Sequence, residues 1–264
     1  MDHAIHLIKI AGTGARLSKT DIVDAFKIMP LHPSQWPMFG IKWEKKFYFS
    51  VRLSFGCRSS PHLFNLISEA LCWILLNINR LPFVLHLLDD FLLIDFPSSR
   101  PSQALETLKS LFARLNIPLS AEKTQGPTTK LEFLGICLDS QRMCASLPPD
   151  KLTRVRSFID LFLSSSSLTK SDLLSLLGHL NFAMRIIPQG RSFISHLLDL
   201  VAELPFPKSP LILDQGSRSD LTFWGLLLNH WNGISFFYDE LPSPPRKILL
   251  VHRRRGFRRV RRFS

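Results

Sequence analysis

Two adjacent aspartates in the middle of an apolar run are the feature that most constrains this chain. Asp89 and Asp90 interrupt residues 83–94, which are otherwise built almost entirely from large apolar side chains. A run of this length is typical of a buried strand or a buried helix, and its periodicity does not separate the two. A buried ionised carboxylate must be paired or must coordinate a metal, whereas Asp suits a turn. The run therefore predicts two strands that meet at an acidic turn, which is either a plain hairpin or a site for a cation.

Two more stretches combine an apolar run with an acid or with a bend. Residues 19–31 again place an acid, Asp21, inside a strand-like apolar run, and residues 53–64 contain a bend that leads into a long apolar helix. In their order, spacing and content, residues 19–31, 53–64 and 83–94 resemble motifs A, B and C of reverse transcriptases. Residues 177–183 and 187–191 resemble in particular the polymerases of DIRS-type (tyrosine-recombinase) retrotransposons. The resemblance extends from about Leu17 to about Tyr238.

The resemblance implies an α+β fold, with a ferredoxin-like (split βαβ) palm followed by a helical thumb and a connection. We expect the palm with a remnant of the fingers at residues 1–145, the thumb at 146–204, the connection at 205–245 and a basic tail at 246–264. The pattern of apolar residues predicts helices at 61–78, 102–116, 150–163, 169–186 and 191–204. It predicts a hairpin at 43–53, and the resemblance implies another at 130–136. Ser59 or Ser60 is expected to cap the first of these helices.

The resemblance also implies catalytic roles for individual residues. Asp21, Asp89 and Asp90 match the metal-binding carboxylates, which would hold two Mg²⁺ ions, because oxygen ligands suit magnesium. Lys123 falls where motif D has a lysine, which would protonate the leaving pyrophosphate as a general acid. Its alternative interpretation is an ordinary exposed lysine. The family usually has Tyr two residues before the first Asp of motif C, whereas this chain has Leu87.

Further residues match the substrate sites of the family. Phe26 matches the aromatic steric gate that excludes the 2′-hydroxyl of a ribonucleotide, and Asp24 falls near the same pocket, with a helix or turn cap as its alternative role. Phe55 and Gly56 are expected beside the incoming nucleotide and the templating base. The hairpin with Phe133, Leu134 and Gly135 resembles the primer grip, motif E. The implied partners are an RNA template, a DNA primer and a deoxynucleoside triphosphate.

The positive charge of the chain is concentrated at its C-terminus. Of 33 Lys and Arg residues, nine follow residue 245, so that 24 basic residues face 21 acidic ones in the rest of the chain. Two interpretations fit this tail. The run of Arg with Val, Phe and Ser is what Gly/Ala-rich coding sequence yields when it is read out of frame, and shifted by one position it resembles the first strand of a ribonuclease H. Otherwise it is a basic tail that binds RNA or directs nuclear import.

The cysteines and the apolar runs indicate the compartment. Cys57, Cys72, Cys137 and Cys144 form no CxxC pair, which argues against a zinc site and a disulfide framework. No uninterrupted apolar run reaches the roughly 18 residues of a membrane span, and the N-terminus lacks the features of a secretion signal. We expect an intracellular protein, cytoplasmic or nuclear, with no membrane partner. The sequence does not determine its oligomeric state.

The function implied by the resemblance is RNA-directed DNA polymerisation, a two-metal nucleotidyl transfer to a primer 3′-hydroxyl. Because motif A begins about 20 residues after Met1, most of the fingers is expected to be missing, and activity of the chain is expected to be weak or absent. Two alternatives stay open. One is a non-catalytic remnant that binds an RNA–DNA hybrid. The other is a ribonuclease H assignment that comes from the full-length polyprotein, although no in-frame ribonuclease H carboxylate set is recognisable.

Overall fold

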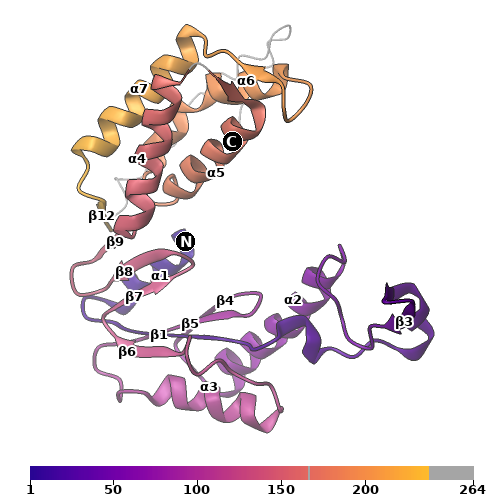
Figure 1. Cartoon of the computed structure of the whole chain (residues 1–264). Coiled ribbons are helices and arrows are strands. Elements are labelled where there is room, and N and C mark those ends of the chain that lie inside the picture. The colour runs from indigo at the N-terminus through magenta and orange to yellow at the C-terminus, as the bar shows by residue number, and fades with distance from the viewer. Residues whose placement is uncertain (166, 238–264) are drawn as a thin grey trace, which may run out of the picture.

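The computed structural model describes residues 1–165 and 167–237 (Figure 1). The basic tail predicted at 246–264 and the end of the expected connection lie outside the described residues. The helices are α1 (Asp2–Ala11), η1 (Ala25–Ile28), η2 (Pro33–Phe39), α2 (Ser60–Trp73), η3 (Ile74–Ile78), α3 (Gln103–Arg114), α4 (Pro149–Ser164), α5 (Lys170–Ala183), η4 (Pro188–Phe193), α6 (Ser195–Glu203) and α7 (Gln215–His230). The strands are β1 (Arg16–Asp21), β2 (Gly40–Trp43), β3 (Lys46–Phe49), β4 (Phe83–Leu87), β5 (Asp90–Asp95), β6 (Gln125–Thr128), β7 (Lys130–Phe133), β8 (Ile136–Asp139), β9 (Cys144–Ser146), β10 (Leu168–Thr169), β11 (Pro210–Leu211) and β12 (Ile234–Phe236).

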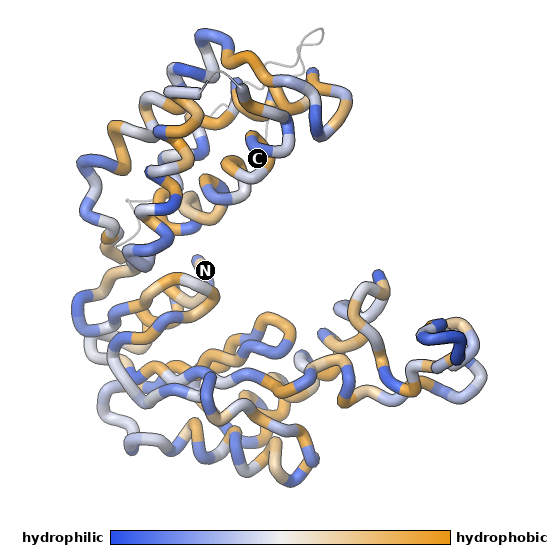
Figure 2. Tube along the Cα trace, viewed as in Figure 1, coloured by the Kyte–Doolittle hydropathy of each residue, from blue (hydrophilic) through white to orange (hydrophobic). Residues whose placement is uncertain are grey.

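The centre of the molecule is a four-stranded sheet in the order β4-β5-β1-β6, with all three pairs antiparallel. Strand β5 is apolar along almost its whole length because both of its faces are covered. Phe91 and Leu93 pack in the cluster that contains α2 and α3, whereas Leu92 and Ile94 pack in the cluster that contains α1. Successive side chains of a strand point to opposite faces, so an unbroken apolar run is what a sheet between two layers requires. Figure 2 shows β4 and β5 coloured mostly as hydrophobic.

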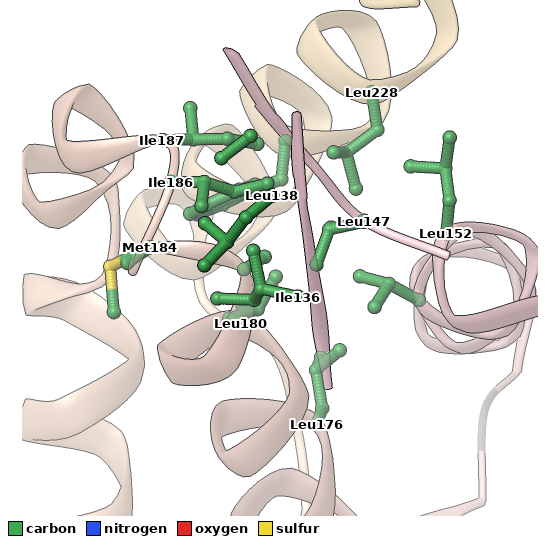
Figure 3. Close-up of a cluster of buried hydrophobic side chains, with 14 of the residues drawn as sticks. Ile136, Leu138, Leu147, Leu152, Leu176, Leu180, Met184, Ile186, Ile187 and Leu228 are labelled. Atoms are coloured by element: carbon green, nitrogen blue, oxygen red, sulfur yellow. The ribbon is translucent and has the colours of Figure 1, made fainter. Parts of the chain in front are cut away.

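A second sheet, β12-β9-β8-β7, connects the central sheet to a bundle of helices α4 to α7 (Figure 1). Strand β8 contributes Ile136 and Leu138, both fully buried, to the cluster that also contains Leu180 of α5 and Leu228 of α7. Figure 3 shows these two strand residues among the side chains of the helices. One continuous hydrophobic core therefore runs from α1 through both sheets into the bundle.

Local capping defines two of the bundle helices. Thr169 and Asp172 form a reciprocal capping box at the start of α5, as expected for this pair of residue types. Asp214 caps α7 through the backbone N–H of Ser217, at 2.6 Å, and this hydrogen bond lowers the pKa of the Asp214 carboxyl. Helix α7 packs on α4 and α6, so the segment expected to be the connection contributes a helix, which the sequence analysis did not predict, to the same bundle as the helices predicted for the thumb.

The secondary structure predicted from the sequence is confirmed for most elements, with shifted ends. The predicted helix at 191–204 begins later, at Ser195, because Pro188–Phe193 forms the separate short helix η4. Ser59 occupies the N-cap position of α2 as expected, but its side chain makes no capping hydrogen bond. The Ser59 hydroxyl instead lies 3.2 Å from the Cys57 thiol, and the Ser60 hydroxyl donates to the carbonyl of Ser54. The first predicted hairpin forms from residues 40–49, with its turn at Glu44 and Lys45.

Helix α2 continues through the π-helical turn η3 as one helix over Ser60–Ile78. By length and composition this helix would suffice to cross a membrane, although the sequence contains no uninterrupted apolar run of that length. Phe64, Leu71 and Leu75 on one of its faces are buried in the core beneath the central sheet. A core helix passes the same test of length and composition, so the observation is weak evidence for a membrane partner.

Candidate active site

The antiparallel register of β1 and β5 brings two distant aspartates together. Asp21, the last residue of β1, lies directly opposite Asp90, the first residue of β5. Asp89 is in the turn between β4 and β5, and its carbonyl accepts a hydrogen bond of 3.1 Å from the backbone N–H of Ile22. One carboxylate oxygen from each of the three aspartates lies within 4.8 Å of the others. The structure thus collects at one end of the central sheet the three carboxylates that the sequence singled out.

The turn that presents Asp89 is tight. Leu88, the residue before it, adopts a left-handed backbone conformation with φ of 54°, as two-residue hairpin turns require. Pairing of Leu87 with Asp90 closes the hairpin, and the Leu87 side chain is exposed. The predicted hairpin is confirmed, with Asp89 in the turn and Asp90 already in the strand.

The local electrostatics make a cation favourable. Asp21 is buried and the other two aspartates are half-buried. Burial raises the pKa of the Asp90 carboxyl, and repulsion from Asp21 and Asp89 raises it further, while Lys123 and Lys19 act in the opposite direction. Like charges in close proximity disfavour the ionised form unless a cation compensates them. This donor set, made only of carboxylate oxygens, suits Mg²⁺.

Lys123 supplies one positive charge to this site. Its ammonium group donates a hydrogen bond of 2.9 Å to Oδ2 of Asp21, and this bond is the main reason that the pKa of Lys123 is raised. The loop that carries the lysine is fixed against the end of β1. Ser120 donates its N–H to the carbonyl of Asp21, and the Thr124 hydroxyl lies 2.8 Å from the hydroxyl of Thr20. Lys123 is therefore a partner of Asp21, although its own side chain is largely exposed.

Of the residues expected at the nucleotide site, the first group is Phe26, Phe55 and Gly56, and Asp24 stands apart from it. Phe26 of η1 is nearly buried, and its ring centre lies 4.9 Å from that of Phe55 and 5.5 Å from that of Phe64. Gly56, with φ of +83°, has open space where a Cβ would lie. Asp24 instead adopts a left-handed conformation, and its carboxylate pairs with Lys27 at 2.8 Å. It occupies the N-cap position of η1, although its side chain makes no capping hydrogen bond, and it is not part of the carboxylate group at the end of the sheet.

The expected primer-grip segment forms the turn between β7 and β8. Phe133 is buried, and Leu134 and Gly135 both have positive φ, of 49° and 79°. Lys151 of α4 donates a hydrogen bond of 3.0 Å to the carbonyl of Gly135 and lies 3.7 Å from the carboxylate of Glu132. This lysine joins the helical bundle to the turn.

Sequence reasoning missed several residues that organise the site. Lys19 of β1 donates to the carbonyl of Glu132 at 2.6 Å and so ties the central sheet to the second sheet. Thr20 and Thr124 fix the loop of Lys123. No local sequence pattern predicts these contacts, because the partners are more than 100 positions apart. The alternation of β1 alone indicated only that Lys19 and Asp21 share one face.

Comparisons with known proteins give a consistent result. Residues 2–138 match the family described as "Reverse transcriptase (RNA-dependent DNA polymerase)". The Pro-Pol polyprotein of Simian foamy virus type 1 is 26% identical over 204 residues, which cover 76% of this chain and 16% of that protein. Protein P of duck hepatitis B virus (strain China) is 26% identical over 181 residues, which cover 67% of this chain and 22% of that protein. The chain thus spans less than a quarter of the length of either relative.

Solved structures show the same fold. The foamy viral protease-reverse transcriptase in complex with an RNA/DNA hybrid aligns with a TM-score of 0.63 and 22% identity, covering 81% of this chain and 27% of that one. The dRH form in complex with double-stranded DNA aligns with a TM-score of 0.62 and 20% identity, covering 81% and 35%. At this identity the similarity establishes the fold, and it confirms the mixed α and β architecture predicted from the sequence.

Proposed function

Because this chain belongs to the reverse transcriptase family, we propose that it transfers nucleotides to the 3′-hydroxyl of a DNA primer as directed by an RNA template. The observation that carries the proposal is the meeting of Asp21, Asp89 and Asp90 at one end of the central sheet, with oxygens within 4.8 Å of one another. We assign the chain to the DIRS-type subfamily on residues 177–183 and 187–191, and we place it in the cytoplasm or the nucleus.

The carboxylates would hold two Mg²⁺ ions, which supply activation of the primer hydroxyl and neutralisation of charge on the triphosphate. The donor set fits these ions because it is made of oxygens, and burial together with repulsion from Asp21 and Asp89 raises the pKa of Asp90, so that a cation would be welcome there. Asp21 and Asp90 are fixed by their strands, and Asp89 by its turn. This rigidity orients the ligands before substrate arrives.

Other residues of the chain would act on the substrate. We propose that Lys123 leaves its partner Asp21, pairs with the leaving pyrophosphate and donates a proton to the pyrophosphate. Phe26, backed by Phe64, would lie under the sugar and reject a 2′-hydroxyl, with Phe55 and Gly56 beside the base. The turn of Phe133, Leu134 and Gly135 would hold the primer end. The sheets at residues 1–145 would be the palm and the helices that follow the thumb, with α7 of the expected connection packed among them.

Primer extension tests the proposal. The full chain is incubated with poly-rA, an oligo-dT primer, dTTP and Mg²⁺, in parallel with an Asp89→Ala, Asp90→Ala double variant. We expect weak extension by the wild type, in keeping with the small part of the fingers in this chain, and no detectable extension by the variant, because Asp21 alone is left of the three carboxylates that would hold the metal ions. Asp199→Asn, an exposed acid on α6, is the matched control and should extend normally.

Absence of extension by folded wild type would overturn the proposal. If the same protein still bound the template–primer duplex, and the double variant bound it equally well without metal, the chain would be a non-catalytic hybrid-binding protein. Cleavage of the RNA strand would instead support the ribonuclease H alternative.

A further inference from the structure

A half-buried lysine of β1 makes a direct bond to the second sheet. Lys19 lies two residues before Asp21, and its ammonium group donates a hydrogen bond of 2.6 Å to the backbone carbonyl of Glu132 in β7. Side chains two positions apart in a strand point to the same face of the sheet. Lys19 therefore leaves the central sheet on the face that presents the carboxylate of Asp21, and it connects this face to β7.

The carbonyl of Glu132 needs such a donor because β7 is an edge strand. The second sheet has the order β12-β9-β8-β7, so β7 has a strand partner on one side only. An edge strand leaves a row of N–H and C=O groups without strand partners. A hydrogen bond from an ionised donor is stronger than one between neutral groups. The bond from Lys19 thus holds this edge of the second sheet against the central sheet.

A second lysine holds the same segment to the helical bundle. Lys151 of α4 lies 3.7 Å from the carboxylate of Glu132 and donates a hydrogen bond of 3.0 Å to the carbonyl of Gly135. Glu132 is thus bonded to the central sheet through its backbone and paired with the bundle through its side chain. Figure 1 shows β7 between these two parts of the molecule. The turn of residues 133–135, proposed to hold the primer end, follows Glu132 directly.

The charge of Lys19 explains less than its hydrogen bond. Burial and repulsion from Asp21 and Asp89 raise the pKa of the Asp90 carboxyl, whereas Lys123 and Lys19 act in the opposite direction, and the effect of Lys19 is the weaker of the two. The hydrogen bond of Lys19 goes to the carbonyl of β7 and not to a carboxylate. We therefore distinguish two roles for this lysine, a counter-charge for the site and a fixed link between two strands.

We propose that Lys19 is a positioning residue, which fixes β7 and the turn of residues 133–135 at a set distance from the carboxylates. Lys19 and Asp21 are separated by about 7 Å along their strand, so the link is short and stiff. Reacting atoms must be held about 3–3.5 Å apart, and a displacement of about 1 Å can cost about 10²-fold in rate. The link between the sheets is a property of the fold, whereas its use for a primer rests on the proposed function.

Hydrogen exchange measured by mass spectrometry tests the link on the full chain without substrate. Wild type is compared with Lys19→Met, which has a side chain of similar length and no charged donor. We expect the amides of residues 130–137 to exchange about tenfold or more faster in the variant, because a charge-assisted hydrogen bond that holds this segment is lost. The amides of α3, which packs elsewhere on the central sheet, should exchange as in wild type.

Primer extension separates position from charge. At saturating Mg²⁺ and template–primer, Lys19→Met should lower the maximal rate by about tenfold or more, with little change in the Mg²⁺ concentration that gives half-maximal rate. Lys19→Arg retains a charged donor of different shape and should recover only part of this rate. A lysine that acted through its charge alone would give a shifted Mg²⁺ requirement, an unchanged maximal rate and full recovery in Lys19→Arg.

Two control variants make the assignment specific. Glu132→Gln weakens the pair with Lys151 but keeps the backbone carbonyl that Lys19 uses, so the effect of Lys19→Met on exchange should persist in this background. Lys109→Met removes a lysine of the surface pair on α3 and should change neither the exchange of residues 130–137 nor the rate. Circular dichroism verifies that each variant is folded.

Two results would overturn the proposal. One is equal exchange of residues 130–137 in wild type and Lys19→Met, whether or not the chain extends primers. The other is faster exchange in the variant together with an unchanged maximal rate of extension. Absence of extension by wild type would count against the proposed function, and the exchange experiment would still decide whether Lys19 fixes the turn.

Discussion

The ammonium group of Lys123 lies 2.9 Å from Oδ2 of Asp21, so the lysine expected to act on pyrophosphate pairs with a carboxylate expected to bind metal. The two residues are 102 positions apart. The pair places a cation where the site has an excess of negative charge. Under the proposed function, Lys123 and Mg²⁺ would compete for the same oxygen of Asp21, and this competition leads to a measurable prediction.

Replacing Lys123 with Met should separate its competition with Mg²⁺ at Asp21 from its action as a general acid. The Mg²⁺ concentration that gives half-maximal extension should fall, because Asp21 no longer has a competing cation. The maximal rate should fall by about 10²-fold or more, the range for losing a general acid. Magnesium titrations of primer-extension rate measure both quantities. Lys109→Met, which removes the surface pair with Glu106, is the control, and an equal loss there would contradict the assignment.

Without metal, Asp90 should contribute more to the stability of the protein at acid pH than at neutral pH. Burial and the neighbouring aspartates raise its pKa in the folded state. The folded state therefore binds the proton more tightly than the unfolded state, and stability falls as pH rises from the unfolded pKa through the folded one. Asp90→Asn removes this penalty, so its Tm at pH 7 without metal should lie above that of the wild type.

Calorimetry with and without Mg²⁺ provides the check on Asp90. Wild type should gain stability from Mg²⁺ at pH 7, and this gain should disappear as pH falls below the raised pKa, because a protonated carboxyl is a poor ligand. A Tm of Asp90→Asn below that of wild type at pH 7 without metal would show that the carboxylate has a structural role instead.

Phe26 should determine the choice of sugar. Phe26→Val shortens the ring that is expected under the sugar, so incorporation of ribonucleotides relative to deoxyribonucleotides should rise by roughly tenfold or more. The measurement is extension with rUTP against dTTP. Phe64→Leu, which alters the fully buried ring behind Phe26, should lower stability by about 1–3 kcal/mol without changing the ratio. Equal ratios in wild type and Phe26→Val would refute the gate.

Lys151 should matter more for primer use than for folding. It holds the turn at Gly135 through a hydrogen bond of 3.0 Å and lies 4.8 Å from the ring of Phe182. Lys151→Met should cost about 1 kcal/mol in stability and raise the KM for primer more than it lowers kcat. A purely structural lysine would leave the KM unchanged. Steady-state extension at varied primer concentration distinguishes these results.

Gly190 should be intolerant of any side chain. A Cβ there would lie 2.2 Å from the ring of Trp224, which is fully buried and donates its Nε1–H to the carbonyl of Phe193. Gly190→Ala therefore overpacks the core of the bundle and should cost about 1–3 kcal/mol. Gly178→Ala, with open space at its Cβ, is the matched control on α5. Urea unfolding of both variants measures the difference, and equal midpoints would refute the packing argument.

The sequence by itself determined the local elements and the identity of the three carboxylates. An apolar run interrupted by Asp89 and Asp90 has few stable solutions, and the one that forms is a hairpin of a half-buried edge strand, β4, and a buried strand, β5. The order of the motifs was sufficient to identify the family. These conclusions depend on neighbours within a few residues, where periodicity and turn chemistry are informative.

Only the tertiary structure decided how these elements meet. The register of β1 against β5 places Asp21 opposite Asp90, and a shift by one residue would have turned Asp21 to the other face. The pairing of Lys123 with Asp21 and the anchoring of Gly135 by Lys151 depend on loops and helices that converge from distant positions. The exposure of Trp43 and Phe47 likewise emerged only in the structure, because the sequence of an aromatic hairpin is the same whether a neighbouring element covers it or leaves it in solvent.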